Sequence, residues 1–100
     1  MRTAQIFFQN QPAGLLTEDN KKYSFVYHDN YQGRPISVTM PVDQKKFEYS
    51  SFPPFFDGLL PEGPQLESLL KHAKLDRHDY LGQLITVGQD LVGAVTVKMT

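Results

Sequence analysis

The 100-residue sequence contains no cysteine and no tryptophan, and its charge has no excess of either sign. Without cysteine the chain has no disulfide, no thiolate nucleophile and no cysteine-based zinc site. With 10 Lys+Arg residues against 11 Asp+Glu residues and a formal charge of −1, it also lacks the basic excess that supplies the phosphate contacts of nucleic-acid-binding proteins. We therefore expect no direct binding to DNA or RNA.

Long apolar runs are absent as well. No segment approaches the roughly 18 apolar residues that a transmembrane helix needs, and polar side chains interrupt the first ten residues. These patterns predict a cytoplasmic protein with no signal peptide and no membrane contact. The length predicts one domain over residues 1–100. A domain of this size buries only about two-thirds of its unfolded surface, so we expect it to benefit from a partner that covers apolar area.

The N-terminal part of the chain has the alternation of apolar and polar residues that is typical of β-strands. This period of two predicts strands over residues 3–9, 14–17, 23–28 and 36–40, separated by turn-forming polar residues. Residues 41–54 are polar and irregular in pattern, and we expect a loop there.

The period then changes to that of a helix. The apolar residues at i, i+3, i+4 and i+7 are Leu66, Leu69, Leu70 and Ala73. Pro64 opens this helix, and a second helix follows Asp76, with Asp79 in its first turn and an apolar stripe over 80–85. A closing strand is expected over 91–97. The order predicts an α+β fold in which a small antiparallel or mixed sheet of about five strands packs with two helices.

The sequence contains no arrangement of residues that predicts catalysis. The three histidines have no metal-ligand spacing: His28, His72 and His78. Ser37 has no base beside it in the sequence, and the carboxylates of Asp57 and Glu62 flank an apolar segment with no evident cleft. We expect a protein that is not an enzyme and that holds neither a cofactor nor a metal.

Residues 52–64 form the most unusual segment, with three Phe, two Leu, four Pro and two Gly in thirteen residues. Proline fixes φ and removes backbone donors, so the segment is too broken for a long helix or a paired strand. It is also too apolar for an ordinary solvated loop. Its Phe and Leu side chains either cap the open face of the sheet or present a rigid apolar edge to a partner, and the two roles are compatible.

Residues 55–63 resemble the F-F-x-x-L-L-P-E-G signature of the N-terminal subdomain of HipA-type serine/threonine kinase toxins. Four other segments resemble motifs of that family in the same order, at residues 14–16, 23–27, 36–41 and 84–95. The resemblance covers roughly residues 10–97 and implies the fold of that subdomain. The kinase residues of the toxins have no counterpart positions in this sequence.

A free-standing subdomain of this kind resembles the HipS-type subunits of tripartite HipBST toxin–antitoxin systems. The resemblance implies an antitoxin that docks on the N-lobe of a HipT-like kinase toxin and hinders its active site. It also implies a ternary complex in which a HipB-like helix-turn-helix protein binds DNA. The expected partner-binding residues lie in the apolar segment and the turn that follows it: Phe52, Phe55, Phe56, Leu59, Leu60, Glu62, Gly63, Pro64 and Gln65.

Two alternatives remain open from the sequence. A large aromatic side chain in the turn would plug the kinase cleft, but Pro64 and Gln65 do not provide one, which favours restraint of a mobile kinase loop. The alternative function is a non-inhibitory adaptor or assembly subunit that links the kinase to the HipB-like partner.

Overall fold

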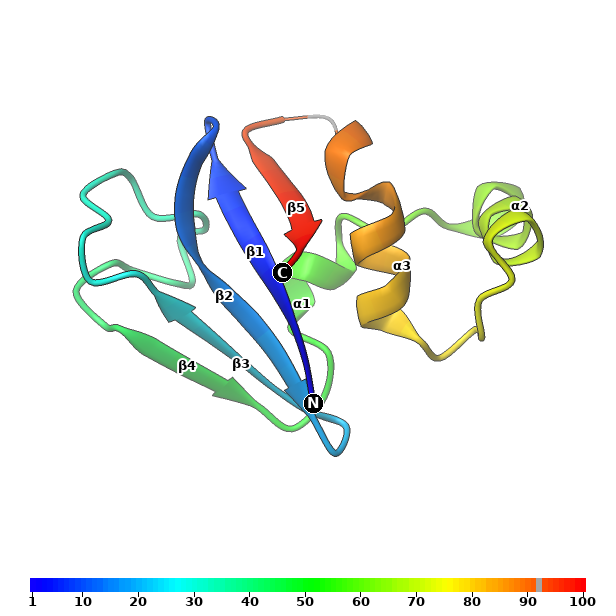
Figure 1. The fold of residues 1–100 in the computed structure, drawn as a ribbon, viewed down its shortest axis with the longest axis horizontal. Coiled ribbons are helices and arrows are strands. Elements are labelled where there is room, and N and C mark those ends of the chain that lie inside the picture. The colour runs from blue at the N-terminus through cyan, green and yellow to red at the C-terminus, as the bar shows by residue number, and fades with distance from the viewer. Residues whose placement is uncertain (92) are drawn as a thin grey trace.

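Five antiparallel strands form one sheet in the computed structural model, which describes residues 1–91 and 93–100. Along the sheet the order is β4-β3-β2-β1-β5 (Figure 1). The strands are β1 Arg2–Phe8, β2 Gln11–Asp19, β3 Lys22–Tyr27, β4 Lys46–Tyr49 and β5 Val95–Met99. The predicted α+β fold with a small antiparallel sheet is confirmed.

Two tight hairpins join the first three strands. The loop residues Gln9 and Asn10 have φ values of 50° and 67°, and Asn20 and Lys21 have values of 52° and 66°. Positive φ at both central positions is the backbone geometry that matches the twist of the flanking strands. Because the loops are only two residues long, β2 is longer at both ends than the strand predicted over 14–17.

The strand predicted over 36–40 is wrong, because this segment is a loop that folds around Tyr27. The Tyr27 hydroxyl accepts a hydrogen bond from the Ile36 N–H (3.0 Å) and donates one to the Met40 carbonyl oxygen (2.5 Å). These bonds hold the loop with Ile36 and Met40 buried in the core. The fourth strand, β4, instead lies in the segment 41–54 that we expected to be irregular.

Three helices and a short 3-10 segment follow the fourth strand: α1 Pro54–Asp57, α2 Gly63–Ala73, α3 Tyr80–Val87 and η1 Gly88–Asp90. Both predicted helices are confirmed, and α1 adds one turn inside the apolar segment. The closing strand predicted over 91–97 begins later, at Val95, and Val92 lies outside the described residues. In the described part of the chain, no helix has the length and apolar character needed to cross a membrane.

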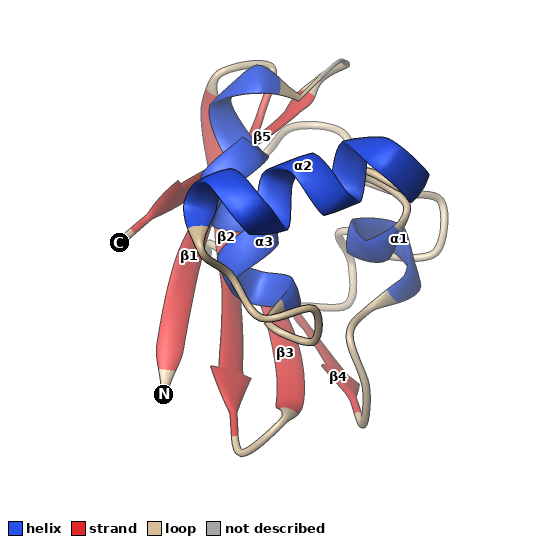
Figure 2. Cartoon of the chain, turned by 90° about the vertical axis from the view of Figure 1, so that its right-hand side faces the viewer, coloured by secondary structure: helices blue, strands red, loops and turns tan. Residues whose placement is uncertain are grey.

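The core lies between one face of the sheet and the helices α1 and α3. Figures 1 and 2 show α3 next to the sheet and α2 beyond it, as the outermost layer. The sheet contributes the inward residues Ala4, Ile6, Leu16, Phe25 and Val97, and the helices contribute Phe56, Leu81 and Leu84. A side chain at Gly14 would have its Cβ 2.8 Å from Phe25 Cζ, so glycine is needed there for the Phe25 ring to fit.

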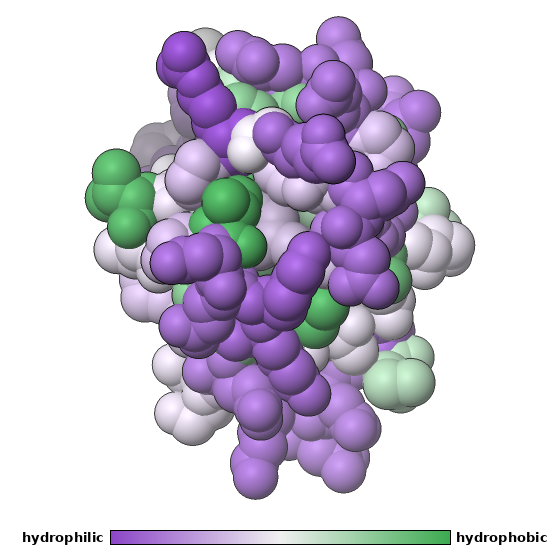
Figure 3. Space-filling model, turned by 90° about the vertical axis from the view of Figure 1, so that its left-hand side faces the viewer, coloured by the Kyte–Doolittle hydropathy of each residue, from purple (hydrophilic) through white to green (hydrophobic). Residues whose placement is uncertain are grey.

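The side of the molecule with β4 and the preceding loop is mainly hydrophilic, with isolated apolar side chains (Figure 3). Val38, for example, is 98% exposed at the loop tip. The free edge of β4 carries Lys46, whose carbonyl oxygen accepts a hydrogen bond from Gln44 Nε2 at 3.0 Å. Charged side chains and local hydrogen bonds of this kind disfavour the pairing of further strands at an edge.

We predict that Tyr27→Phe lowers the free energy of unfolding by about 1–3 kcal/mol, because it leaves the buried Ile36 N–H and Met40 C=O groups without their partner. Urea unfolding followed by circular dichroism measures this change. The control is Tyr49→Phe, since the half-buried Tyr49 hydroxyl forms no hydrogen bond with the described residues. We expect the control to change stability by less than about 0.5 kcal/mol. Equal effects of the two substitutions would contradict the anchoring role of Tyr27.

Candidate partner-binding surface

The structure places the residues of the apolar segment at different depths. Phe52 and Phe56 are buried, with 9% and 0% of their surface exposed. Phe55, Leu59 and Leu60 are half-buried and pack against the edge of the core. The remaining predicted residues are exposed: Glu62, Gly63, Pro64 and Gln65. The accessible part of the predicted surface therefore consists of the half-buried side chains and the exposed turn.

Aromatic contacts fix the buried part of the segment on the sheet. The Phe56 ring lies 5.9 Å from the Phe25 ring, and the Phe55 ring meets the Phe56 ring edge-on at 5.2 Å. Phe52 contacts Tyr23 edge-on at 5.2 Å. These geometries are those that aromatic pairs prefer in protein cores. Phe52 and Phe56 thus hold the segment in place from below.

The exposed turn leads into α2 through a left-handed glycine. Gly63 has a φ of +60°, in the region that favours glycine, and Glu62 before it is extended. Pro64 stands at the start of the helix, where its missing N–H would have no helical partner. The sequence Pro-Glu-Gly-Pro therefore sets a sharp change of direction between α1 and α2.

Helix α2 has no buried residue, although its sequence is amphipathic. The four apolar residues that predicted the helix are all half-buried: Leu66, Leu69, Leu70 and Ala73. One set of interactions joins the helix to the loop after it, and another joins that loop to α3. Arg77 Nη2 donates to both carboxylate oxygens of Glu67, and the buried Gln83 side chain donates to the Asp76 and Arg77 carbonyl oxygens at 3.3 and 3.0 Å. The helix is thus an outer layer with incompletely covered apolar side chains.

An ion-pair network links the first strand to the start of α3. Arg2 donates to Asp79 at 2.6 Å and to Glu18 at 2.8 Å. Asp79 caps α3, because its Oδ1 accepts a hydrogen bond from the Gly82 N–H at 3.1 Å. We had expected Asp79 inside the first turn of the helix, so the helix begins slightly later than predicted. The network borders a cleft of about 800 Å³.

The network also determines how its groups titrate. The hydrogen bond from Arg2 lowers the pKa of Asp79, with a further contribution from the Gly82 N–H. Burial raises the pKa of Tyr23 to about 12, and the hydrogen bond that its hydroxyl donates to Glu18 acts in the same direction. The carboxylate of Asp79 is therefore stabilised in its charged form in the folded protein.

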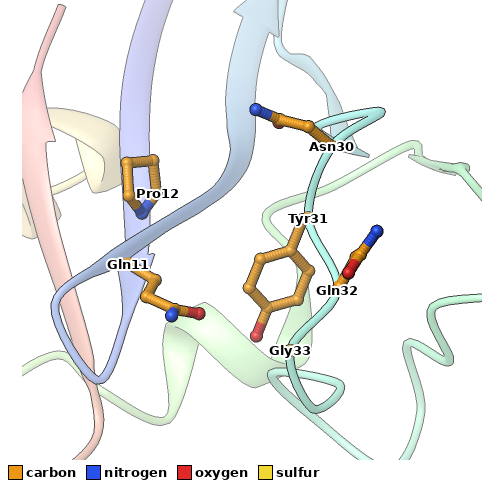
Figure 4. Close-up of a pocket in the computed structure, with 6 residues that line it drawn as sticks. All are labelled: Gln11, Pro12, Asn30, Tyr31, Gln32 and Gly33. Carbon is orange, nitrogen blue, oxygen red and sulfur yellow. The ribbon is translucent and has the colours of Figure 1, made fainter.

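Among residues 1–91 and 93–100, the structure brings together no set of side chains that predicts catalysis. A hollow of about 550 Å³ is lined by neutral residues around Tyr31 (Figure 4). The Tyr31 hydroxyl donates to the Arg34 carbonyl oxygen at 2.6 Å, and the Tyr31 ring stacks on Tyr27 at 5.7 Å. Both interactions hold the loop that folds around Tyr27. No group of three His, Asp or Glu side chains within residues 1–91 and 93–100 is placed to hold a metal ion.

Three residues have roles that the sequence does not predict: Arg2, Gln83 and Tyr80. Tyr80 belongs to the predicted apolar stripe of its helix, but its ring also stacks on Phe52 at 5.5 Å and borders the cleft. Gln83 stands among the apolar residues of α3, and a polar residue at such a position is a signal for a buried hydrogen-bonding role. Arg2 gives no local signal, because its partner Asp79 lies 77 residues away.

Comparison with known proteins places this architecture in a family. The family model described as "HipA N-terminal domain" matches residues 4–98. An uncharacterised protein of Haemophilus influenzae is 32% identical over 98 residues, which cover 98% of this chain and 92% of that protein. A solved structure titled "N-terminal domain of HipA toxin" has a TM-score of 0.80 and 28% identity, and the match covers all of this chain and 93% of that one.

The fold and the surface together define an α+β domain whose accessible features are an exposed turn and an incompletely covered helix. The chain belongs to the HipA N-terminal domain family. The matched region takes up nearly all of the 100 residues.

We predict that Arg2→Gln reduces the dependence of stability on acid pH. The folded pKa of Asp79 lies below its ordinary value of about 3.8, so its charged form stabilises the fold above that pH. This stabilisation is lost as the pH falls through the folded pKa. Urea unfolding from about pH 5 to about pH 2 should show a smaller loss of stability for Arg2→Gln than for the wild type.

The matched control for this titration is Arg34→Gln, since Arg34 is exposed and forms no ion pair among the described residues. We expect this variant to keep the wild-type dependence of unfolding free energy on pH. If Arg2→Gln also kept the wild-type dependence, the assignment of the lowered Asp79 pKa to Arg2 would be contradicted.

Proposed function

We propose that this chain is an antitoxin that binds and neutralises a HipT-like serine/threonine kinase toxin. In this proposal it works in the cytoplasm, in a ternary complex whose HipB-like helix-turn-helix subunit binds the DNA. The family supports a connection with HipA-type toxins, since a matching structure is titled as the N-terminal domain of one. The near-neutral charge of −1 is compatible with leaving DNA contact to another subunit.

The observation that carries the proposal is the position of α2. This helix follows the F-F-x-x-L-L-P-E-G segment directly, it is amphipathic, and it has no buried residue. In a domain of 100 residues a helix of 11 residues is a large part of the structure to leave incompletely covered. Uncovered apolar surface next to rigid aromatic residues is typical of a protein-binding surface.

The surface divides into two functional parts in this proposal. Phe55, Leu59 and Leu60 supply the apolar contacts with the kinase N-lobe, while the turn at 62–65 reaches toward the kinase cleft. Pro64 fixes its own φ, Gly63 adopts the positive φ that the change of direction needs, and Gln65 carries no large ring. A turn without an aromatic plug is suited to restraining a mobile kinase loop rather than filling the active site.

Phe52 and Phe56 act from beneath the surface. Because both side chains are buried in the core, they position the apolar segment and are poor targets for an interface test. Replacing Phe56 with a polar residue would unfold the chain and abolish binding for a reason unrelated to the interface. The exposed turn gives the sharper test.

We predict that Glu62→Lys combined with Gln65→Lys abolishes protection against the kinase while leaving the fold intact, because both residues are exposed at the start of α2. The measurements are cell survival on co-expression with the HipT-like kinase of the same organism, co-purification of the two chains, and the melting temperature of the free variant. The melting temperature should stay within a few degrees of that of the wild type.

A control variant carries the same change in charge on the opposite loop. Asp43→Lys combined with Val38→Lys also replaces one acid and one neutral exposed residue by lysine, and we expect it to protect as the wild type does. Full protection by Glu62→Lys/Gln65→Lys would contradict the proposed surface. If the wild-type chain binds the kinase but does not protect the cell, the adaptor role is favoured. The same holds if it protects only when the HipB-like subunit is present.

A further inference from the structure

Two clefts lie on either side of Tyr80. The larger, of about 800 Å³, lies between the end of the sheet and the start of α3. The smaller, of about 260 Å³, lies between the α1–α2 turn and α3. His78 and Tyr80 line both clefts. The two hollows are thus parts of one surface that crosses the Tyr80 ring.

A series of aromatic rings forms the centre of this surface. Phe52 stacks on Tyr80 with an interplanar angle of 27° and meets Tyr23 edge-on, and the His78 ring lies 6.3 Å from the Tyr80 ring. Phe52 and Tyr23 are buried, whereas Tyr80 is half-buried. Tyr80 therefore lies between the buried Phe52 ring and the exposed His78 ring, and it remains half accessible.

The charges around Tyr80 are mainly negative. The carboxylates that line the two clefts belong to Glu18, Asp57, Glu62, Asp76 and Asp79. Arg2 pairs with Glu18 and Asp79, and Arg77 pairs with Glu67. Across residues 1–91 and 93–100, no lysine or arginine pairs with Asp57, Glu62 or Asp76, although His78 Nδ1 lies 3.7 Å from Asp76 Oδ1. Lys21 at the rim of the larger cleft is the one further cation among these lining residues.

A guanidinium group complements this arrangement better than an ammonium group does. It stacks on an aromatic face and also donates paired hydrogen bonds to carboxylates. The chain itself shows the pairing with carboxylates in the larger cleft, where Arg2 donates to both Glu18 and Asp79. An ammonium group would form the ion pair without the planar stacking.

We infer that the Tyr80 surface, defined as Tyr80 with Asp57, Glu62 and Asp76, binds an arginine side chain of a partner protein. Where that partner is the kinase, the inference rests on the proposed function and specifies the chemistry of the kinase segment that contacts this side. The arginine lies on the Tyr80 ring and pairs with the neighbouring carboxylates. The apolar side chains near the exposed turn supply the remaining contact.

The test uses the full chain labelled with ¹⁵N and a small probe, N-acetyl-arginine amide, followed by NMR at millimolar concentration. Chemical-shift changes should centre on His78 and Tyr80 and disappear at high salt. The neutral isostere N-acetyl-citrulline amide should cause no such changes. Asp57→Asn combined with Asp76→Asn should weaken arginine binding about threefold or more. Asparagine at 76 keeps the acceptor for the His78 N–H, so the fold should be retained.

The matched control removes the same number of charges elsewhere. Asp43→Asn combined with Asp90→Asn changes two exposed acids outside both clefts, and it should bind the probe as the wild type does. The inference is overturned by any of four results: no shift with arginine, shifts centred elsewhere, equal shifts with citrulline, or unchanged binding in Asp57→Asn/Asp76→Asn.

Co-purification with the kinase separates this inference from the proposed function. If the wild type and Asp57→Asn/Asp76→Asn bind the kinase equally, the proposed function stands and the arginine contact with the kinase is wrong. If the wild type does not bind the kinase but the arginine probe binds at Tyr80, the proposed function is wrong and the Tyr80 surface serves another protein. Weaker kinase binding by the variant, with wild-type binding by Asp43→Asn/Asp90→Asn, supports both.

Discussion

The packing of Phe56 on the sheet is the constraint on which the rest of the surface depends. Phe56 is fully buried against Phe25, and the one-turn helix α1 can direct only one side of itself toward the sheet. With Phe56 inside, Phe55 lies at the edge of the core. The chain then turns at residues 61–63, and α2 runs outside α3 because the inner layer is already filled (Figure 2). The exposure of α2 is thus a consequence of how its neighbours pack.

The elements that were predicted correctly are those with a local signal. The alternation in β1 and β3 and the i, i+3, i+4 spacing in α2 can be read within ten residues of sequence. The segment 36–40 has the same alternation, but its Ile36 N–H and Met40 C=O groups bond to Tyr27, which lies 9 and 13 residues away. A local pattern cannot show that hydrogen bonds to a distant side chain take the place of strand pairing. Strand β4 has only four residues, which is too short for its alternation to stand out.

The composition of the apolar segment predicts where the candidate surface lies. It does not predict how deeply each residue of that segment is buried. Phe55 and Phe56 are adjacent residues of one type, and only the direction of α1 relative to the sheet decides that one is buried and the other half-buried. The Tyr80 surface depends on contacts of still longer range. The ion pair between Arg2 and Asp79 joins residues that are 77 positions apart, and the stacking of Phe52 on Tyr80 joins two elements that no local pattern connects.

The segment 55–63, which resembles a signature of HipA N-terminal subdomains, contains residues of two kinds. Phe56 is required by the core, and Gly63 is required by a backbone φ of +60°. Glu62 is exposed and forms neither a hydrogen bond nor an ion pair among the described residues. Glu62 is the N-cap residue of α2, where the helix dipole favours a negative charge, but its side chain makes no capping hydrogen bond. Its carboxylate lines the smaller cleft, where the exposed turn meets Tyr80, and so stays available for the contact with a partner proposed above.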